Sequence, residues 1–337
     1  MTATEGLLPI AVDAMGGDNA PDAIVAGARR AADELGVPVV LVGRSAELGD
    51  TGGLDVIEAS EVIAMDADPG SSVRRMKDSS LVRAAEAVRD GRASAMVSAG
   101  NTGATMASAL LRMGRIRGVA RPAIATPIPV PGADRPTILL DAGANAECQP
   151  DWLVQFAQMG SVYATDRYGV TAPKLGLLSI GEEATKGNTL VKATHALLAE
   201  GSWARATGAS FVGNVEGRDI MTDAVDVVVT DGFTGNVVLK TLEGSMRSLV
   251  GAILGAFGTD DATRAAADTL MPALAPLYQT LDPDNTGGAM LLGVDGVCII
   301  SHGSSSATAV FNAVEVAAEM VRGDLVGRLS ATIRPSG

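Results

Sequence analysis

Short apolar runs alternate with glycine-rich polar turns along this chain, and a helical pattern follows most of these turns. Runs that are apolar at nearly every position are typical of strands covered on both faces. Seven such runs are visible, at Pro9–Val12, Ala95–Val97, Ile138–Leu140, Leu175–Ile180, Ala209–Val212, Val225–Val229 and Val297–Ile300. The alternation predicts an α/β fold that is doubly wound around a mostly parallel sheet.

The predicted helices begin where the turns end. One helix opens at Pro21, since proline is favoured at the first helical position, and others cover Ala104–Met113 and Asp151–Tyr168. No linker-like stretch divides the chain, so we predict a single α/β domain over residues 1–337. The proline-rich segment Arg121–Arg135 is the candidate for a crossing between two halves.

An apolar helical hairpin is predicted at about residues 242–281. Its first stripe comprises Met246, Leu249, Val250, Ile253, Leu254 and Phe257. After a turn at 258–261, a second stripe comprises Ala266, Leu270, Ala273, Leu274 and Leu277, interrupted by Pro272 and Pro276. Ordinary core or a dimer interface is the favoured interpretation. Contact with a membrane or an acyl chain is the alternative, and the missing basic face disfavours it.

Charge and composition exclude several classes of function. The chain has 26 Lys and Arg against 39 Asp and Glu, and this net charge of −13 repels nucleic acid and anionic lipid. Its longest near-apolar stretch, Leu249–Phe257, is far shorter than the ~20 residues of a membrane span. No secretory signal is visible at the N-terminus, and two cysteines make no disulfide framework. We therefore expect a cytoplasmic protein.

The cysteines and histidines are too few and too widely spaced for a metal site. Cys148, Cys298, His195 and His302 make up the whole set, and no pair has the spacing of a zinc motif. We expect no metal and no cofactor.

The turns themselves indicate what the chain binds. In a doubly wound sheet such turns lie at the carboxyl edge, where each one feeds the N–H-rich start of a helix. Glycine lets an anion approach the backbone closely, and Ser, Thr and Asn add further donors. Any single turn is explained as an ordinary cap, whereas seven of them together favour a small oxyanion such as phosphate.

Several catalytic motifs are absent. No two glycines stand two apart, so the dinucleotide fingerprint G-x-G-x-x-G is missing, and no Gly-Lys pair opens a P-loop. G-x-S-x-G and H-E-x-x-H are also missing. The sequence therefore offers no obvious nucleophile for a covalent acyl-enzyme.

The turns, taken as an ordered set, resemble those of the bacterial phosphate acyltransferase family of phospholipid synthesis. The matching motifs run from about Ile10 to about Val321 and are Ala11–Asp18, Ser98–Ala104, Gly181–Asn188, Gly213–Asp219, Asp231–Asn236 and Ser301–Ser305. The chain departs from the family at Asn19, where the family usually has His, and at Ala146 and Glu147, where it usually has Val-Asp. Asn19 argues against an essential proton transfer at that position.

The resemblance implies transfer of a long acyl group from acyl carrier protein to inorganic phosphate. The acyl phosphate product would serve a membrane partner that acylates glycerol 3-phosphate. The resemblance also implies a fold like that of isopropylmalate dehydrogenases and phosphate acetyltransferases, and a homodimer that associates peripherally with the inner face of the cell membrane.

Three residues are the candidates for catalysis: Lys186, Asn236 and His302. Lys186 would neutralise phosphate or the developing oxyanion, and Asn236 would donate to the same oxygen or act only as a helix cap. His302 would protonate the leaving thiol or merely orient its turn. The candidates for binding substrate or phosphate are Asp13, Gly16, Gly17, Asn101, Thr102, Asp141, Asn145, Asn188, Asn214, Asp231, Thr234, Ser304 and Ser305. Because three carboxylates would repel phosphate, we expect some of them to hold backbone N–H groups instead.

Three other functions compete with this interpretation. Phosphate acetyltransferase-like transfer from acyl-CoA needs a cationic site for the CoA phosphates, and the sequence shows no such cluster of Lys and Arg. An oxidoreductase of the isopropylmalate dehydrogenase type is a second rival, and a non-catalytic phosphate-binding scaffold for membrane lipid enzymes is the third.

Overall fold

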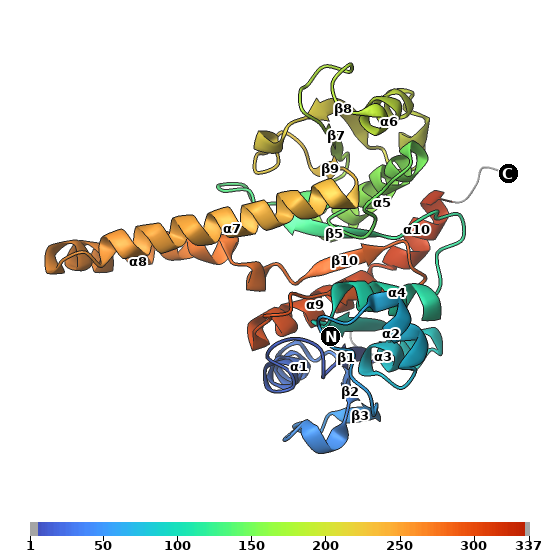
Figure 1. Ribbon diagram of the computed structural model, residues 1–337, viewed down its shortest axis with the longest axis vertical. Helices are drawn as coiled ribbons and strands as arrows, with labels where there is room; N and C mark the ends of the chain where they lie inside the picture. The colour runs from blue at the N-terminus through green and yellow to red at the C-terminus, as the bar shows by residue number, and fades with distance from the viewer. Residues whose placement is uncertain (1–5, 334–337) are drawn as a thin grey trace.

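The computed structural model describes residues 6–333, and its core is one sheet of 11 strands (Figure 1). The strands are β1 (Ile10–Asp13), β2 (Val39–Gly43), β3 (Asp55–Glu58), β4 (Ala95–Ser98), β5 (Ala123–Ile128), β6 (Thr137–Leu140), β7 (Lys174–Leu178), β8 (Ser210–Val215), β9 (Val227–Val229), β10 (Ala289–Leu292) and β11 (Val297–Ile300). Their order across the sheet is β3-β2-β1-β4-β11-β10-β5-β6-β9-β7-β8.

Ten α-helices and four short 3-10 helices accompany the sheet within the described residues. The α-helices are α1 (Asp22–Leu35), α2 (Pro69–Arg75), α3 (Ser80–Arg89), α4 (Thr102–Arg112), α5 (Pro150–Tyr168), α6 (Thr189–Ala199), α7 (Gly232–Phe257), α8 (Asp261–Leu281), α9 (Ala307–Arg322) and α10 (Leu325–Ile333). The 3-10 helices are η1 (Ser45–Glu47), η2 (Ser202–Ala206), η3 (Gly217–Asp219) and η4 (Pro283–Asn285).

Helices cover both faces of the sheet, which confirms the predicted doubly wound α/β fold. In the half built on β1–β4, α1 and α9 pack together on one face, and α2, α3 and α4 cover the other (Figure 1). Alternate strand residues supply the two cores: Ile10 and Val12 point into one, and Ala11 points into the other. The strands are therefore buried on both sides, as their unbroken apolar runs predict.

The sheet consists of two parallel halves that run in opposite directions. β3, β2, β1, β4 and β11 are parallel, and so are β6, β9, β7 and β8. β10 and β5 lie between them, and the three antiparallel pairings β11–β10, β10–β5 and β5–β6 reverse the direction. The expectation that all seven turns share one carboxyl edge is therefore wrong, because the turns fall into two oppositely directed sets.

The structure adds to one local prediction and corrects another. The segment Arg121–Arg135 does carry the chain from one half of the sheet to the other, and it does so as the central strand β5. The strand predicted at Ala209–Val212 continues to Val215 as β8 and leads into η3, with no α-helix after it. The reason is a bulge: the register with β7 shifts after Leu175, and Gly213 adopts a positive φ of 109°, which carries the strand past its glycine.

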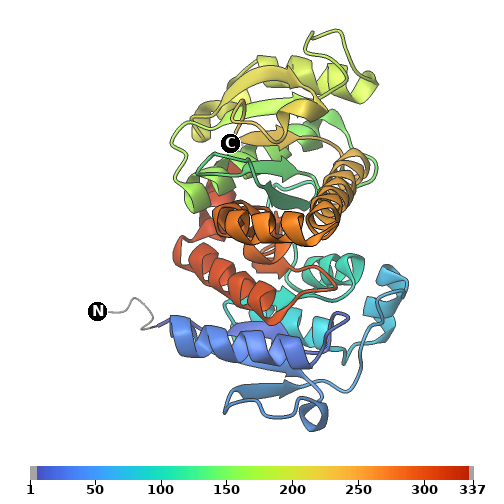
Figure 2. The same cartoon turned by 90° about the vertical axis from the view of Figure 1, so that its left-hand side faces the viewer.

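The predicted hairpin protrudes from the body of the molecule as α7 and α8 (Figures 1 and 2). α7 begins at Gly232, ten residues before the predicted start of the hairpin, and α8 continues through Pro272 and Pro276. The large apolar side chains of the hairpin are exposed, with Leu249 at 62% and Leu254 at 50%. The interpretation of these stripes as ordinary core is therefore wrong for the chain on its own.

Within residues 6–333, no helix is both long enough and apolar enough to cross a membrane.

Candidate active site

Three turns meet at the carboxyl ends of β1, β4 and β11, and we call them the first turn cluster (residues 13–19, 98–101 and 301–306). Asp13 is fully buried at its centre and accepts a hydrogen bond of 2.7 Å from the Ser98 hydroxyl. Burial raises the pKa of Asp13, and hydrogen bonds from Ser80 and Ser98 oppose the rise. A side chain at Gly16 would overlap the Asp13 carboxylate, so glycine is required for this close approach.

Backbone contacts hold the 301–306 turn against the β1 turn. Asp18 N donates to Gly303 O at 2.7 Å, and the Asn19 amide donates to the carbonyls of Ser304 and Ser305 at 3.1 and 3.2 Å. Gly17 packs against Gly303 from a positive φ of 106°. Asn19 thus acts as a hydrogen-bond donor that fixes the turn, which needs no proton transfer.

The β4 turn places one candidate inward and one outward. Asn101 caps α4 by accepting from Ala104 N, and its amide donates to the carbonyls of Met65 and Ala67 at 2.8 and 3.2 Å. An amide carries two donor hydrogens, so both of them are occupied. Thr102, the next residue, is exposed in the first turn of α4.

The second turn cluster (residues 141–145 and 231–236) lies at the carboxyl ends of β6 and β9. Asp141 is fully buried, and its two oxygens accept from the backbone N–H groups of Ile124, Gly143, Ala144 and Asn145. The Asn145 amide donates to Asp141 Oδ2 at 2.9 Å and to Pro122 O at 2.8 Å. Burial raises the pKa of Asp141, whereas these donors favour the carboxylate. Asp141 therefore shapes the turn.

α7 starts against this cluster. Asp231 is its N-cap and accepts from the backbone N–H and the hydroxyl of Thr234, both at 2.8 Å. A side chain at Gly235 would overlap the carbonyl oxygen of Asp141, so glycine lets the helix approach. Asn236 lies one turn into the helix and is exposed beside Gly143, so the interpretation of Asn236 as the N-cap is wrong.

Lys186 lies in the turn after β7, which we call the third turn (residues 179–188). Its side chain is exposed and has no ion-pair partner within residues 6–333. Asn188 caps α6 by accepting from Val191 N at 2.9 Å. Asn214 is buried behind the turn, where its amide donates to Glu183 O and its oxygen accepts from His195 Nδ1, both at 2.9 Å. Asn214 is therefore placed to position the turn that carries Lys186.

A lysine that the sequence reasoning did not single out links the first cluster to the second. Lys240 lies four residues after Asn236 on α7, hence on the same helix face. Its Nζ lies 2.8 Å from Glu243 Oε2 and 3.4 Å from His302 Nε2. The helix that starts in the second cluster thus contacts the first through Lys240. The i, i+4 spacing from Asn236 was the signal available in the sequence.

The contact with Lys240 bears on which ring nitrogen of His302 carries the proton. An ammonium group can only donate, so its approach to Nε2 favours the tautomer in which Nε2 accepts and Nδ1 carries the ring proton. Nδ1 then donates to the Ser304 hydroxyl oxygen at 2.9 Å, and the hydroxyl hydrogen of Ser304 remains available to donate to another group. In the other tautomer, Nδ1 would accept from Ser304 N at 3.4 Å, and the proton on Nε2 would face Lys240 Nζ at 3.4 Å, with Glu243 Oε2 4.0 Å away as an acceptor. Ser305, next along, is buried and donates to His302 O.

Neither cysteine has the character of a nucleophile. Cys298 is fully buried, and burial raises its pKa to about 12. Cys148 is half-buried, and burial together with the nearby Asp141 carboxylate also raises its pKa to about 12. Within the described part of the chain, no group of three or more His, Cys, Asp or Glu side chains is arranged to hold a metal ion.

The candidate residues thus separate by exposure into a buried group and an exposed group, with Gly17, Asn145, Asp231 and Thr234 half-buried between them. Asp13, Gly16, Asn101, Asp141, Asn214 and Ser305 are buried and build the turns. Thr102, Lys186, Asn188, Asn236, Lys240, His302 and Ser304 are exposed. Lys240 is paired with Glu243 and both nitrogens of His302 have partners, whereas Lys186 has no ion-pair partner within residues 6–333. Two cations and several neutral donors among the exposed residues suit an anion. A hollow of about 610 Å³ between α6, η2 and β8 borders the third turn at Glu182, but no residue of the two clusters lines it.

Comparisons with known proteins agree with this architecture over almost the whole chain. A family described as "Fatty acid synthesis protein" matches residues 8–328. A phosphate acyltransferase from Elusimicrobium minutum is 50% identical over 334 residues, which cover 96% of this chain and 95% of that protein. A phosphate acyltransferase from Heliobacterium modesticaldum is 46% identical over 333 residues, which cover 96% and 97%.

Solved structures show the same fold at low sequence identity. The EutD phosphotransacetylase from Staphylococcus aureus has a TM-score of 0.61 at 16% identity, covering 95% of this chain and 96% of its own. A phosphotransacetylase from Streptococcus pyogenes has a TM-score of 0.64 at 16% identity, covering 94% of each chain. The resemblance to the phosphate acetyltransferase fold is thereby confirmed.

Proposed function

The chain belongs to the fatty acid synthesis protein family, in which its near relatives are phosphate acyltransferases, and from this premise we propose the reaction in detail. The protein is an acyltransferase of lipid synthesis that uses phosphate as acceptor. Our proposal is that the donor is a long-chain acyl group on acyl carrier protein, and that bound phosphate attacks it directly with no acyl-enzyme.

In the proposed step, a phosphate oxygen attacks the carbonyl carbon of the thioester. A C–O bond forms, a tetrahedral oxyanion develops, and the C–S bond then breaks. The proton of hydrogen phosphate ends on the carrier thiol, so acyl phosphate and free carrier are the only products. Holding phosphate against the thioester and stabilising the oxyanion are the tasks that the protein must perform.

One observation carries the proposal: the exposed lysine and amide lie on a turn and a helix start that side-chain hydrogen bonds hold in place. Lys186 projects from a turn fixed by Asn214, and Asn236 lies on a helix whose start is fixed by Asp231. Such preorganised donors stabilise charge without rearranging during the reaction. We assign Lys186 and Asn236 to the developing oxyanion and the phosphate.

The 301–306 turn is assigned to phosphate binding rather than to proton transfer. Both nitrogens of His302 have partners, at Lys240 and Ser304, which favours the orienting role of this histidine over general-acid catalysis. Ser304 and Thr102 supply neutral hydroxyl donors, and Lys240 supplies a second positive charge. The absence of a reactive thiol at Cys148 and Cys298 is consistent with direct attack.

We also propose a homodimer in the cytoplasm that associates peripherally with the membrane and supplies acyl phosphate to a membrane glycerol-3-phosphate acyltransferase. The exposed apolar stripes of α7 and α8 support a dimer contact, since large apolar side chains at this exposure are costly without a partner. Net charge and the lack of a basic face disfavour strong membrane binding by the hairpin.

The test is thiol release from palmitoyl-carrier protein with and without phosphate, and in parallel from palmitoyl-CoA and acetyl-CoA. We expect phosphate-dependent release from the carrier, with the CoA thioesters slower. Faster turnover of acetyl-CoA would favour the phosphate acetyltransferase reaction instead. No release from any thioester would favour a phosphate-binding scaffold.

A further inference from the structure

The basic residues of this acidic chain are concentrated in one segment. Residues 69–120 contain nine Lys and Arg against three Asp and Glu, whereas the remaining chain contains 17 against 36. The segment forms α2, α3, β4 and α4, and these helices pack together on one face of the sheet. A protein of net charge −13 therefore presents one locally positive surface.

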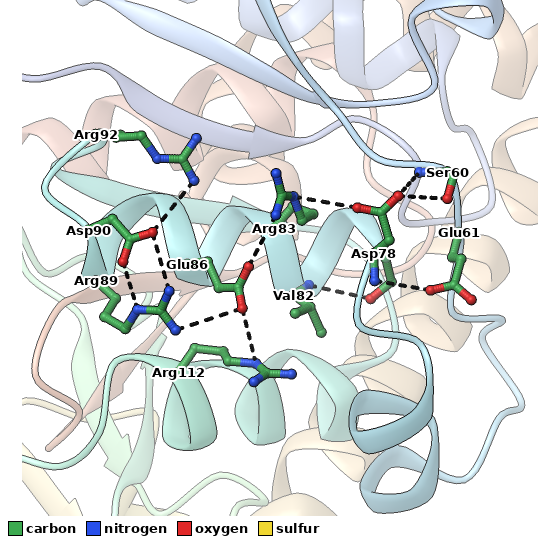
Figure 3. Close-up of polar contacts among 11 residues, drawn as sticks. Ser60, Glu61, Asp78, Val82, Arg83, Glu86, Arg89, Asp90, Arg92 and Arg112 are labelled. Atoms are coloured by element: carbon green, nitrogen blue, oxygen red, sulfur yellow. Dashed lines mark hydrogen bonds and ion pairs between the residues drawn. The ribbon is translucent and has the colours of Figure 1, made fainter.

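Four guanidinium groups gather where α3 and α4 lie side by side (Figure 3). We call them the arginine cluster: Arg83, Arg89, Arg92 and Arg112. Glu86 lies 3.5 Å from Arg83 and 3.7 Å from both Arg89 and Arg112. Asp90 lies 2.8 Å from Arg89 and 3.8 Å from Arg92. Four positive charges therefore surround two negative ones, with Asp78 at the edge of the cluster, 3.6 Å from Arg83.

The cluster has more donors than its own carboxylates can use. Each guanidinium carries five N–H groups, so the four groups have more donors than Glu86, Asp90 and Asp78 can accept, although the Nε atoms of Arg83 and Arg112 are buried and out of reach of an external partner. The side chains of Arg89 and Arg92 are 43% and 45% exposed, so they can reach an external partner. Carboxylates are the groups that guanidinium forks bind best among protein side chains.

Apolar side chains accompany these charges. Leu110 and Leu111 are exposed in the last turn of α4, at 36% and 50%, next to Arg112. Basic groups beside exposed leucines suit an amphipathic helix with an acidic rim, because such a helix offers apolar contact and carboxylates together.

The exposed end of the arginine cluster, at Arg89 and Arg92, is set back from the candidate site by the length of a helix, whereas Arg83 lies near the start of α3. α3 and α4 both begin at the first turn cluster, where Ser80 bonds Asp13 and Asn101 caps α4. Arg89 and Arg112 lie in the last turns of the same helices. Eleven residues of α-helix rise about 16 Å, so a partner docked there needs an extended arm to deliver its reacting group to the site.

We propose that the arginine cluster and Leu110–Leu111 dock acyl carrier protein through carboxylates on the carrier, and that its acylated arm reaches along α4 to the first turn cluster. This proposal rests on the proposed function, in which the acyl group arrives on a carrier protein. Charge steering from the locally positive surface accelerates the encounter and fixes its register. An anionic lipid surface is the competing occupant, and the vesicle measurement below distinguishes it from the carrier.

The test compares Arg89→Gln/Arg92→Gln with the matched control Arg205→Gln/Arg264→Gln, which removes two exposed positive charges elsewhere. Carrier binding is measured by titration without turnover, and KM is measured for acyl carrier protein, for acyl-pantetheine and for phosphate. We expect the cluster variant to weaken carrier binding and raise the carrier KM about tenfold at low salt. The KM values for acyl-pantetheine and phosphate stay constant, and high salt removes the difference. The control binds as the wild type does, and Arg89→Lys/Arg92→Lys, which keeps the charges without the guanidinium forks, binds better than the Gln variant.

An unchanged carrier Kd in the cluster variant, with its far-UV circular dichroism intact, would overturn the docking surface. Loss of binding to anionic vesicles with an unchanged carrier Kd would assign the cluster to lipid and would also overturn the proposal. In a third outcome, the wild type binds the carrier through the cluster and yet fails to turn over acyl carrier protein. That pair of results would support the docking surface and contradict the proposed function.

Discussion

Lys186 is the side chain on which the proposed chemistry depends most. We expect Lys186→Ala to lower turnover about a hundredfold, by analogy with the ~10²–10³ loss on removing one oxyanion donor. Stability should change by less than ~0.5 kcal/mol, because the side chain is exposed and unpaired within residues 6–333. Steady-state rates and thermal unfolding check this, with Lys192→Ala, an exposed lysine on α6, as control. Near-normal turnover would make Lys186 an ordinary solvated lysine.

Lys240 is expected to hold His302 in the tautomer with the proton on Nδ1. Removing it in Lys240→Met should shift the proton to Nε2 and raise the KM for phosphate more than it lowers kcat, while Lys240→Arg restores much of the wild-type behaviour. Multiple-bond ¹⁵N spectra of the imidazoles report the tautomer, and His195→Gln assigns the two histidines of the chain. A wild-type His302 with its proton on Nε2 would refute this account.

The two thiols are expected to resist alkylation in the folded protein. Thiolate is the reactive form, and burial raises the pKa of both Cys148 and Cys298 to about 12. At pH 8 the native protein should react with iodoacetamide at least tenfold more slowly than the denatured protein, as followed by mass spectrometry. Rapid labelling of native Cys148, prevented by acyl carrier protein or acyl-CoA, would reopen the acyl-enzyme route.

At the scale of elements, the hairpin of α7 and α8 is the feature whose role is least constrained by the fold. Leu254→Ser/Phe257→Ser should leave unfolding nearly unchanged, because Leu254 is half exposed and Phe257 is only partly covered. If the stripes form the dimer contact, sedimentation should show monomers with native circular dichroism. Ala262→Ser/Ala265→Ser, which changes small exposed residues on α8, should remain dimeric.

A membrane contact by the hairpin would give a different result from a dimer contact. A Leu254→Ser/Phe257→Ser variant that stays a stable dimer but no longer sediments with vesicles would make the hairpin a membrane contact and contradict our preference.

The elements that the sequence predicts well are those with an unbroken local signal. α5 was predicted within one residue of its start, since its long helical pattern begins after a proline and ends at a glycine. β2, β3, β5 and β10 were missed, and β5 was hidden because Pro122, Pro127, Pro129 and Pro131 read as a crossing. Proline usually argues against a central strand, because it cannot donate a backbone hydrogen bond. Here β5 is a central strand all the same, since it pairs with β6 and β10.

The candidate site was predictable in its residues but not in its assembly. The residue types of the turns identified Asp141 and Asn145 as candidates. Whether their polar atoms face a ligand or the backbone depends on contacts between residues far apart in the sequence, such as the hydrogen bond from Asn145 to Pro122 O. The directions of the strands could not be predicted from the sequence either. Only the antiparallel pairings of β10 and β5 show that the turns form two sets, and only the position of α7 shows that Lys240 joins them.

At the scale of the whole molecule, we propose that two oppositely directed half-sheets present anion-binding turns to one phosphate and one thioester. The most direct test is ³¹P NMR of the EDTA-treated protein with palmitoyl-carrier protein and phosphate. We predict an acyl phosphate resonance that hydroxylamine removes, formed in step with free carrier thiol. Thiol release without acyl phosphate, or activity that EDTA abolishes and Zn²⁺ restores, would contradict the account.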